Sequence, residues 1–265
     1  MAAMSKPVGD VEPATGDAGE DGRPGPGRPI GLPGTPSRPY NRRVDTSSRF
    51  RDLTVAQFVE ALASGEPVPG GGAAAAIAGS LGAALVLMVA NLSQGRPKYA
   101  EHAALHARAI PAAQELMDRL LALADEDAQA FAGYGAAMRL PRDTDEERAA
   151  RTAAIQEAAL AATLSPLRTV EASLEVVALA EELAGRSNKN ASSDLEVAAL
   201  MSVAACRSAA ANVYINLPSL GDERRARELY ERTEGIADAV ERLASRTREQ
   251  VRGGASRSPL PVEPA

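Results

Sequence analysis

The segment at residues 70–92, "GGGAAAAIAGSLGAALVLMVANL", decides the fold class because it carries no charged residue over its whole length. Three glycines open the segment, and the first charged residues after it are Arg96 and Lys98. A helix that is apolar on every side either spans a membrane or is surrounded by other helices. The remainder of the sequence has to distinguish these two alternatives.

The composition of this segment favours a central helix of a soluble bundle. About half of residues 73–92 are Ala, Gly or Ser, which enter hydrocarbon less readily than Leu, Ile or Phe, and no aromatic belt flanks them. Gly72, Ala76, Gly79 and Ala83 lie along one ridge, where small side chains let another helix approach closely. We therefore expect a buried helix and no membrane, with a membrane span as the alternative.

The whole chain of 265 residues has the composition of an all-α protein. Hydrophobic residues make up 45%, but only 3% are aromatic, so Ala and Leu dominate, together with Glu and Arg. We expect a multi-helix, up-and-down bundle around the small-residue helix. The net charge of −6 argues against nonspecific nucleic-acid binding. The single cysteine, Cys206, reads as a core residue and fits a reducing compartment, and no secretory signal is visible, so we expect a cytoplasmic protein.

Both ends of the chain differ from its middle. Residues 1–51 are rich in Pro and Gly and predict a disordered tail, and residues 253–265 read in the same way. The folded domain is expected at residues 52–252. Capping boxes at Thr54 and Thr144 mark two helix starts. We expect helices at about residues 54–64, 73–92, 97–139 with a kink at Pro111, 144–166, 166–184, 193–216 and 221–252.

The third expected helix contains a carboxylate on its apolar stripe. Leu116, Leu120 and Leu123 define the stripe, and further steps of four residues reach Asp127 and Phe131. A carboxylate among leucines is costly unless it is paired or its pKa rises. A pKa raised towards neutrality suits a general acid or base. The alternatives are a structural ion pair with an arginine of a neighbouring helix, or a helix rotated so that Asp127 is exposed.

The other polar residues allow both a structural and a functional reading. Glycines at a helix start allow close approach of an anion, but they also form tight turns. Arg96 and Lys98 could bind an anion or could be solvated. His102 and His106 lie four residues apart, and without a third ligand we prefer an exposed pair to a zinc site, so no metal is expected. Asn212 and Asn216, also four apart, could cap backbone groups or face a ligand.

Four stretches in a fixed order resemble one known family. They are "PVPGGGAAAAIAGSLGAALVLMVANLSQGRPKY", "LLALADEDAQAF", "NKNASSDLEVAAL" and "NVYINL". The chain between about residues 53 and 251 resembles the cyclodeaminase/cyclohydrolase family, which comprises the C-terminal domain of formiminotransferase-cyclodeaminase and stand-alone relatives that include methenyltetrahydrofolate cyclohydrolases. Each stretch is modest alone, but the ordered set is specific. No formiminotransferase domain is present in the sequence.

The resemblance implies an all-helical homodimer with a tetrahydrofolate site. It implies that Asp127, which the stripe singles out separately, is the catalytic residue. The implied substrate-binding residues are Gly70, Gly71, Gly72, Arg96, Lys98, Asn190, Ser193 and Asp194. The sequence departs from the family pattern at Pro97, where many relatives carry a basic residue, and at Glu196, which replaces a small residue.

The implied activity is that of a folate one-carbon enzyme, either a formiminotetrahydrofolate cyclodeaminase or a methenyltetrahydrofolate cyclohydrolase. Each reaction needs one group that takes and returns a proton, and neither needs a cofactor. The expected substrate is a tetrahydrofolate derivative, possibly with a polyglutamate tail that Arg96 and Lys98 would bind. The alternative is a noncatalytic helical bundle that binds a folate or a partner protein.

Overall fold

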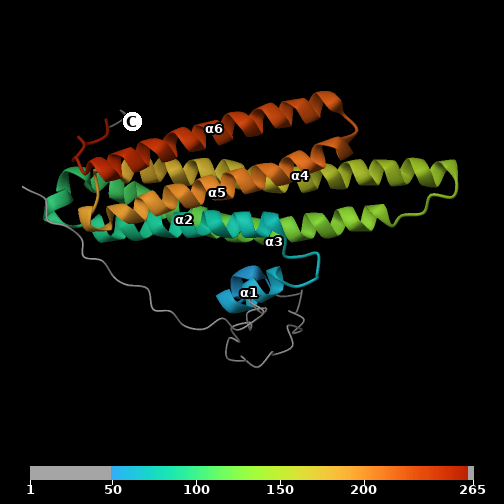
Figure 1. Cartoon of the computed structure of the whole chain (residues 1–265), viewed down its shortest axis with the longest axis horizontal. Coiled ribbons are helices and arrows are strands. Elements are labelled where there is room, and N and C mark those ends of the chain that lie inside the picture. The colour runs from blue at the N-terminus through green and yellow to red at the C-terminus, as the bar shows by residue number, and fades with distance from the viewer. Residues whose placement is uncertain (1–48, 262–265) are drawn as a thin grey trace, which may run out of the picture. The chain divides into compact units, whose positions relative to one another are not determined.

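The structure is a computed structural model in which residues 49–261 are described, and they form an all-α bundle (Figure 1). No strand occurs within these residues, so the predicted fold class is confirmed. The six α-helices are α1 (Val55–Leu62), α2 (Gly71–Ser93), α3 (Ala103–Met138), α4 (Asp145–Leu183), α5 (Ser192–Asn216) and α6 (Glu223–Gly253). Short 3-10 helices precede or join them: η1 (Phe50–Asp52), η2 (Pro97–His102), η3 (Lys189–Ala191) and η4 (Leu217–Leu220).

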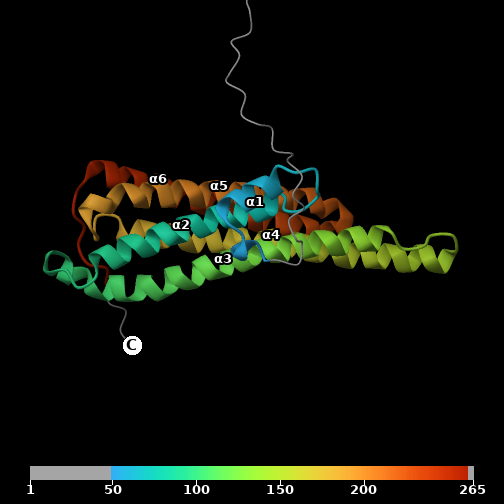
Figure 2. The same cartoon turned by 90° about the horizontal axis from the view of Figure 1, so that it is seen from below.

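Helix α2 packs against α3, α4 and α5, as Figure 2 shows for its neighbours on either side. Ala76, Gly79 and Ala83 are buried, and an added Cβ on Gly79 would touch Leu120 of α3 and Ala205 of α5. The small side chains therefore let two helices approach α2 closely. The stretches Gly71–Ser93 and Lys189–Leu220 are long and apolar enough to cross a membrane, but the core helix of a bundle has the same length and composition.

Two helix starts follow the predicted capping boxes. The Thr54 hydroxyl accepts from the N–H of Gln57, whose side chain in turn accepts from the N–H of Thr54. Thr144 and Glu147 make the same reciprocal pair at the start of α4. Each pair satisfies backbone donors that have no partner within the helix.

The two helices expected on either side of Pro166 form one continuous helix, α4, so that prediction was wrong. Proline has no N–H and leaves the carbonyl oxygen four residues earlier without its helical donor. That oxygen belongs to Ala162, and the Asn216 side-chain N–H donates to it over 2.8 Å. Asn216 therefore replaces the missing helical hydrogen bond, which is the structural reading of this residue. Helix α3 likewise runs through Pro111.

The second half of α3 and the first half of α4 form a hairpin that extends past the end of the other helices (Figures 1 and 2). Because α2 begins only at Gly71, the apolar stripe of α3 has no central helix to cover it beyond Asp127. Leu116, Leu120 and Leu123 are buried, whereas Phe131 is 50% exposed. The predicted stripe thus leaves the core at Asp127.

Segments at both ends of the folded region make specific contacts. The Phe50 N–H donates to the Asp125 carboxylate over 2.7 Å, and the Phe50 ring packs edge-on against Phe58. After α6, Arg257 pairs with the Glu181 carboxylate at 3.2 Å and Leu260 packs on the core. Residues 254–261 thus hold a defined path where we expected disorder. Most of the expected N-terminal tail, residues 1–48, lies outside the described residues.

Candidate functional site

Asp127 reaches from α3 to the first turn of α2. An added Cβ on Gly72 would overlap the Asp127 carboxylate, so only glycine leaves room for that side chain there. The nearby backbone N–H of Ala73 favours the ionised carboxylate. The glycine triplet and the acidic residue singled out by the sequence therefore belong to one feature, a carboxylate held at the start of the central helix.

The environment of Asp127 makes its carboxyl group a weaker acid than an ordinary aspartate. Burial raises its pKa above the ordinary value for aspartate, and the N–H of Ala73 offsets only part of that rise. Asp127 makes no ion pair within residues 49–261, unlike its neighbour Glu126, which lies 2.8 Å from Arg168. The half-buried side chain can therefore change its protonation state without breaking a salt bridge. The two structural alternatives for Asp127, an ion pair and a fully exposed side chain, are therefore excluded for the described part of the chain.

A side-chain amide lies beside the same glycines. The Asn212 side chain would be in ordinary contact with an added Cβ on Gly71, at 3.6 Å from its nitrogen. Its N–H₂ group donates to the Ser208 carbonyl oxygen over 2.8 Å. Asn212 therefore bonds a backbone carbonyl oxygen within its own helix and also brings a polar edge to Gly71, which combines the two readings that its spacing left open.

The other predicted site residues lie at the opposite end of α2. The 23 residues of α2 span about 34 Å at 1.5 Å each. Beyond its end, the Tyr99 hydroxyl in η2 accepts from the N–H of Lys189 in η3 over 3.1 Å, and the Ser93 hydroxyl accepts from the N–H of Asn188 over 2.8 Å. These contacts bring Arg96 and η2, which contains Lys98, to η3 and the first turn of α5, which contain Asn190, Ser193 and Asp194. The predicted site residues of one chain are thus divided between the two ends of α2.

The histidine pair was expected to be exposed, and this expectation was wrong. His102 and His106 are both buried, with ring centroids 6.4 Å apart. The Nε2–H of His106 donates to the Arg186 carbonyl oxygen over 2.9 Å, and the Nε2 of His102 lies 3.4 Å from the Glu101 carboxylate. The chain segment after α4 packs against the end of η2 and the first turn of α3, where these two histidines lie, and four-residue spacing does not reveal this packing. No group of three or more potential metal ligands occurs among the described residues.

Sequence reasoning missed three residues at the far end: Tyr99, His102 and Lys189 line a cavity there together with Lys98. One sequence signal pointed to the lysines. The chain contains 29 Lys and Arg residues, and lysine occurs only at positions 6, 98 and 189.

The protein is thus an all-α bundle with one candidate acid/base group. This group is the unpaired, half-buried carboxylate at the glycine-lined start of the central helix. Sequence comparison specifies the class further. The chain belongs to the family described as formiminotransferase-cyclodeaminase, whose family model matches residues 54–235. This confirms the family that the four ordered stretches indicated.

Individual relatives agree with this assignment. The chain is 43% identical over 199 residues to a methenyltetrahydrofolate cyclohydrolase from Methylorubrum extorquens, covering 75% of this chain and 96% of the relative. It is 38% identical over 167 residues to the formimidoyltransferase-cyclodeaminase of Gallus gallus, covering 63% of this chain and 31% of that protein. The solved structure of a formiminotetrahydrofolate cyclodeaminase from Thermotoga maritima has a TM-score of 0.70 and 27% identity, over 77% of this chain and 98% of the other.

Proposed function

We propose that this protein is a folate one-carbon enzyme that acts as a methenyltetrahydrofolate cyclohydrolase or a formiminotetrahydrofolate cyclodeaminase. The observation that carries the proposal is the placement of Asp127 against Gly72, in a chain that belongs to this family. The nearly full-length match to a cyclohydrolase favours the first reaction. The match of the whole fold to a cyclodeaminase keeps the second as a specific alternative.

In the cyclohydrolase reaction, Asp127 acts first as a base and then as an acid. The carboxylate takes a proton from water while the water oxygen bonds to the methenyl carbon. The protonated Asp127 then gives this proton to one of the two folate nitrogens, and the bond between that nitrogen and the carbon breaks. The remaining hydroxyl proton leaves to solvent as the C=O bond of the formyl group forms. A carboxyl group whose pKa is raised by burial suits both steps.

The cyclodeaminase reaction uses the same residue with a different nucleophile. The side-arm nitrogen bonds to the carbon of the protonated formimino group (CH=NH2⁺), whose C=N π electrons become the lone pair of an NH2 group, and the side-arm nitrogen loses its proton to Asp127. Asp127 then protonates the departing amine, the carbon–nitrogen bond breaks, and ammonia leaves with the methenyl bridge closed. Both reactions move only protons and one-carbon bonds, so we propose that neither a metal nor a redox cofactor takes part.

We propose that the glutamate tail of the folate, including a polyglutamate tail, binds at the other end of α2. Arg96 and Lys98 are exposed there and supply positive charge for the tail carboxylates. Asn190 in η3 and Ser193 and Asp194 in the first turn of α5 supply polar contacts. The length of α2 separates these residues from Asp127 of the same chain. If one folate molecule contacts both groups, Asp127 of one chain has to lie beside Arg96 and Lys98 of a second chain.

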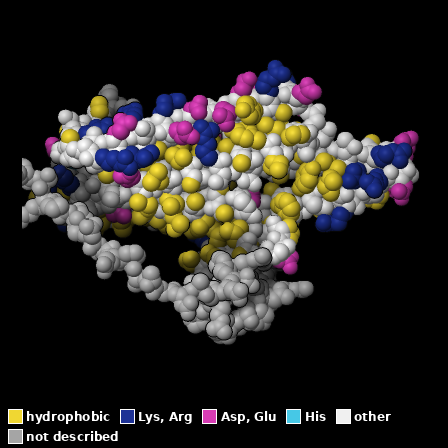
Figure 3. Space-filling model, viewed as in Figure 1, with side chains coloured by type: hydrophobic (Ala, Val, Ile, Leu, Met, Phe, Trp, Pro, Cys, Tyr) yellow, Lys and Arg dark blue, Asp and Glu magenta, His cyan; other side chains and the backbone are white. Residues whose placement is uncertain are grey.

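The exposed apolar surface supports a homodimer. Figure 3 shows apolar side chains spread over the face that α2 and α5 form. Its large exposed members are Leu81, Met88 and Leu92 on α2 and Val197, Leu200 and Ile215 on α5. Apolar surface of this kind marks a protein interface. We propose that a second copy of this chain covers it.

A twofold axis near the middle of α2 would complete the site. Leu81 is 56% exposed and lies close to the midpoint of α2. Two copies related by such an axis place their α2 helices in opposite directions. The glycine end and Asp127 of one copy would then lie beside Arg96 and Lys98 of the other, so each site would contain residues of both chains. We propose that this dimer is a cytoplasmic protein.

The proposed function is tested by Asp127→Asn in the purified protein. The absorbance of the methenyl group reports both reactions, since it disappears in the cyclohydrolase reaction and appears in the cyclodeaminase reaction. We expect the rate of the active reaction to fall by about 100-fold or more. The control is Glu126→Gln, which neutralises the adjacent carboxylate. Equal rates for wild type and Asp127→Asn contradict the acid/base role, and a wild-type protein that binds folate without turnover supports the noncatalytic alternative.

A further inference from the structure

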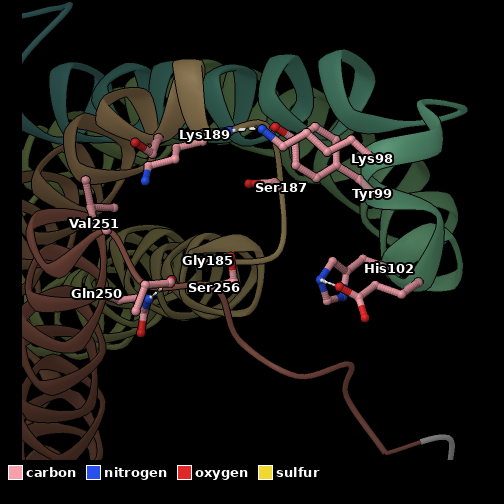
Figure 4. Close-up of a pocket in the computed structure, with 13 residues that line it drawn as sticks. Lys98, Tyr99, His102, Gly185, Ser187, Lys189, Gln250, Val251 and Ser256 are labelled. Carbon is pink, nitrogen blue, oxygen red and sulfur yellow. Dashed lines mark hydrogen bonds and ion pairs between the residues drawn. The ribbon is translucent and has the colours of Figure 1, made fainter.

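A cavity of about 270 Å³ lies at the end of the bundle away from Asp127. Residues of η2, of the loop before α5, and of the end of α6 line it, and Figure 4 shows these three walls around an open space. The segment after α6 closes one side through Ala255 and Ser256. The cavity approaches the size of small-molecule sites, which begin at about 300 Å³.

Both lysines that the structure describes line this one cavity. Arginine supplies nearly all other basic positions of the chain, so lysine is concentrated at this place. Tyr99 links the two, because its ring lies under the Lys98 ammonium at 5.6 Å from the centroid and its hydroxyl accepts from the Lys189 N–H. Glu101 is the one carboxylate among the described lining residues, and it pairs with His102 instead of a lysine. Two ammonium groups therefore face the cavity without a carboxylate partner in residues 49–261.

A buried histidine adds an uncompensated polar group. His102 is 5% exposed, and Figure 4 shows its ring pointing from η2 towards the Gly185 and Ser256 side of the cavity. Its Nε2 lies 3.4 Å from the Glu101 carboxylate, whereas its Nδ1 is buried with no hydrogen-bond partner. Because Nε2–H faces the Glu101 carboxylate, Nδ1 is the acceptor nitrogen, so its missing partner is a donor such as a water molecule and not the anion itself.

The start of α5 adds no free donor at the cavity wall. Ser192 lines the cavity and is the first residue of α5, but its N–H already donates to the Lys189 carbonyl oxygen. The positive charge of the cavity therefore comes from the two lysines, against Glu101 as the one carboxylate among the described lining residues.

We propose that this cavity is a binding site for a small anion with carboxylate or phosphate oxygens, held mainly by Lys98 and Lys189. Lysine carries a compact charge on a flexible stem and adapts to anions of different shape, whereas arginine favours flat, bidentate partners. The side chains of Tyr99 and Val251 add an apolar portion to the lining, which suits a carboxylate carried on a short carbon chain. Lys98 also belongs to the tail-binding residues proposed above, so the inference rests on the proposed function where the anion is a folate tail. The cavity and Lys189 are new to it, and anion binding is measured without turnover.

The experiment is a binding titration by calorimetry on the full-length protein with three separate probes. The probes are γ-glutamyl-glutamate, which has the carboxylates of a folate tail, glutarate, which is a free dicarboxylate, and inorganic phosphate. We expect at least one probe to bind wild type, and the one that binds most tightly identifies the source of the anion. Lys189→Gln is expected to weaken its binding by about tenfold or more, because charge-assisted hydrogen bonds are the strong ones.

The matched control is Arg227→Gln, which removes one positive charge from an exposed position on α6 and lies outside the cavity lining. Melting curves without anion show whether each variant folds, and Lys98→Gln gives a second reading if Lys189→Gln is unstable. Three results overturn the proposal: no probe binds wild type, binding is equal in wild type and in both lysine variants, or Arg227→Gln weakens binding as much as Lys189→Gln. The methenyl assay is measured separately, so failure of the anion site and failure of the proposed function remain distinguishable.

Discussion

The replacement Gly72→Ala tests the central contact of the candidate site, because the new methyl group would occupy the space of the Asp127 carboxylate. Two opposing effects act on stability. Alanine is favoured over glycine within a helix by up to about 1 kcal/mol. Moving a charged acceptor away from the Ala73 N–H costs about 1.5–3 kcal/mol. We therefore expect a net loss of about 0.5–2 kcal/mol, which a domain of this size tolerates.

The effect on catalysis is expected to be much larger than the effect on folding. Displacing a general acid/base removes about 10²–10⁴-fold of rate acceleration. Gly72→Ala should therefore lower the methenyl turnover rate by about 100-fold or more while urea unfolding shows a folded protein. The control is Gly235→Ala on α6, where an added Cβ meets nothing within 4 Å. This variant should gain up to about 1 kcal/mol of stability and keep its activity.

A double-mutant cycle refines the test. If Gly72→Ala acts only by moving Asp127, it should cause no further loss of rate in a protein that already carries Asp127→Asn. Near-wild-type turnover of Gly72→Ala would refute the idea that the carboxylate works from its position at α2. A full additional loss in the Asp127→Asn background would show that Gly72 acts through something other than Asp127.

Three further variants test other parts of the structure. Asn216→Ala removes the donor to the Ala162 carbonyl oxygen and should lower the free energy of unfolding by about 1–2 kcal/mol, measured with urea. Burial lowers the pKa of His102 in the folded protein. The stability linked to this residue is therefore present above the unfolded pKa of 6.5 and is lost as the pH falls through the lower folded pKa. His102→Gln should flatten that part of the acid unfolding profile. Arg257→Ala breaks the pair with Glu181 and should speed proteolysis of the C-terminal segment without changing the urea midpoint by more than about 1 kcal/mol.

The parts of the fold that follow from local sequence were predictable. The capping boxes at Thr54 and Thr144 mark helix starts because a cap depends on residues three positions apart. The burial of α2 was predictable from its composition. In contrast, the break expected at Pro166 was wrong because the compensating donor, Asn216, comes from a helix about 50 residues later in the chain. A local pattern contains no information about such a partner.

The candidate site was predictable in its residues but not in its arrangement. The spacing of the leucines on α3 led to Asp127, and the structure adds that this residue lies against Gly72. The separation of the glycine end from the basic end depends on the length and straight course of α2, and any union of the two depends on a second chain. The burial of the two histidines was missed because the segment that covers His106, at Arg186, lies 80 residues further along the chain.

The contacts that Phe50 and Leu260 make with the bundle have a practical consequence for shortening this protein. The family match ends at residues 54 and 235, so a shortened version cut at those limits would lose the Phe50 amide that holds Asp125, two residues before Asp127. It would also lose the last turns of α6 and the segment that walls the lysine cavity. Each flank secures a different end of the bundle, so removing one at a time gives a way to loosen either end separately.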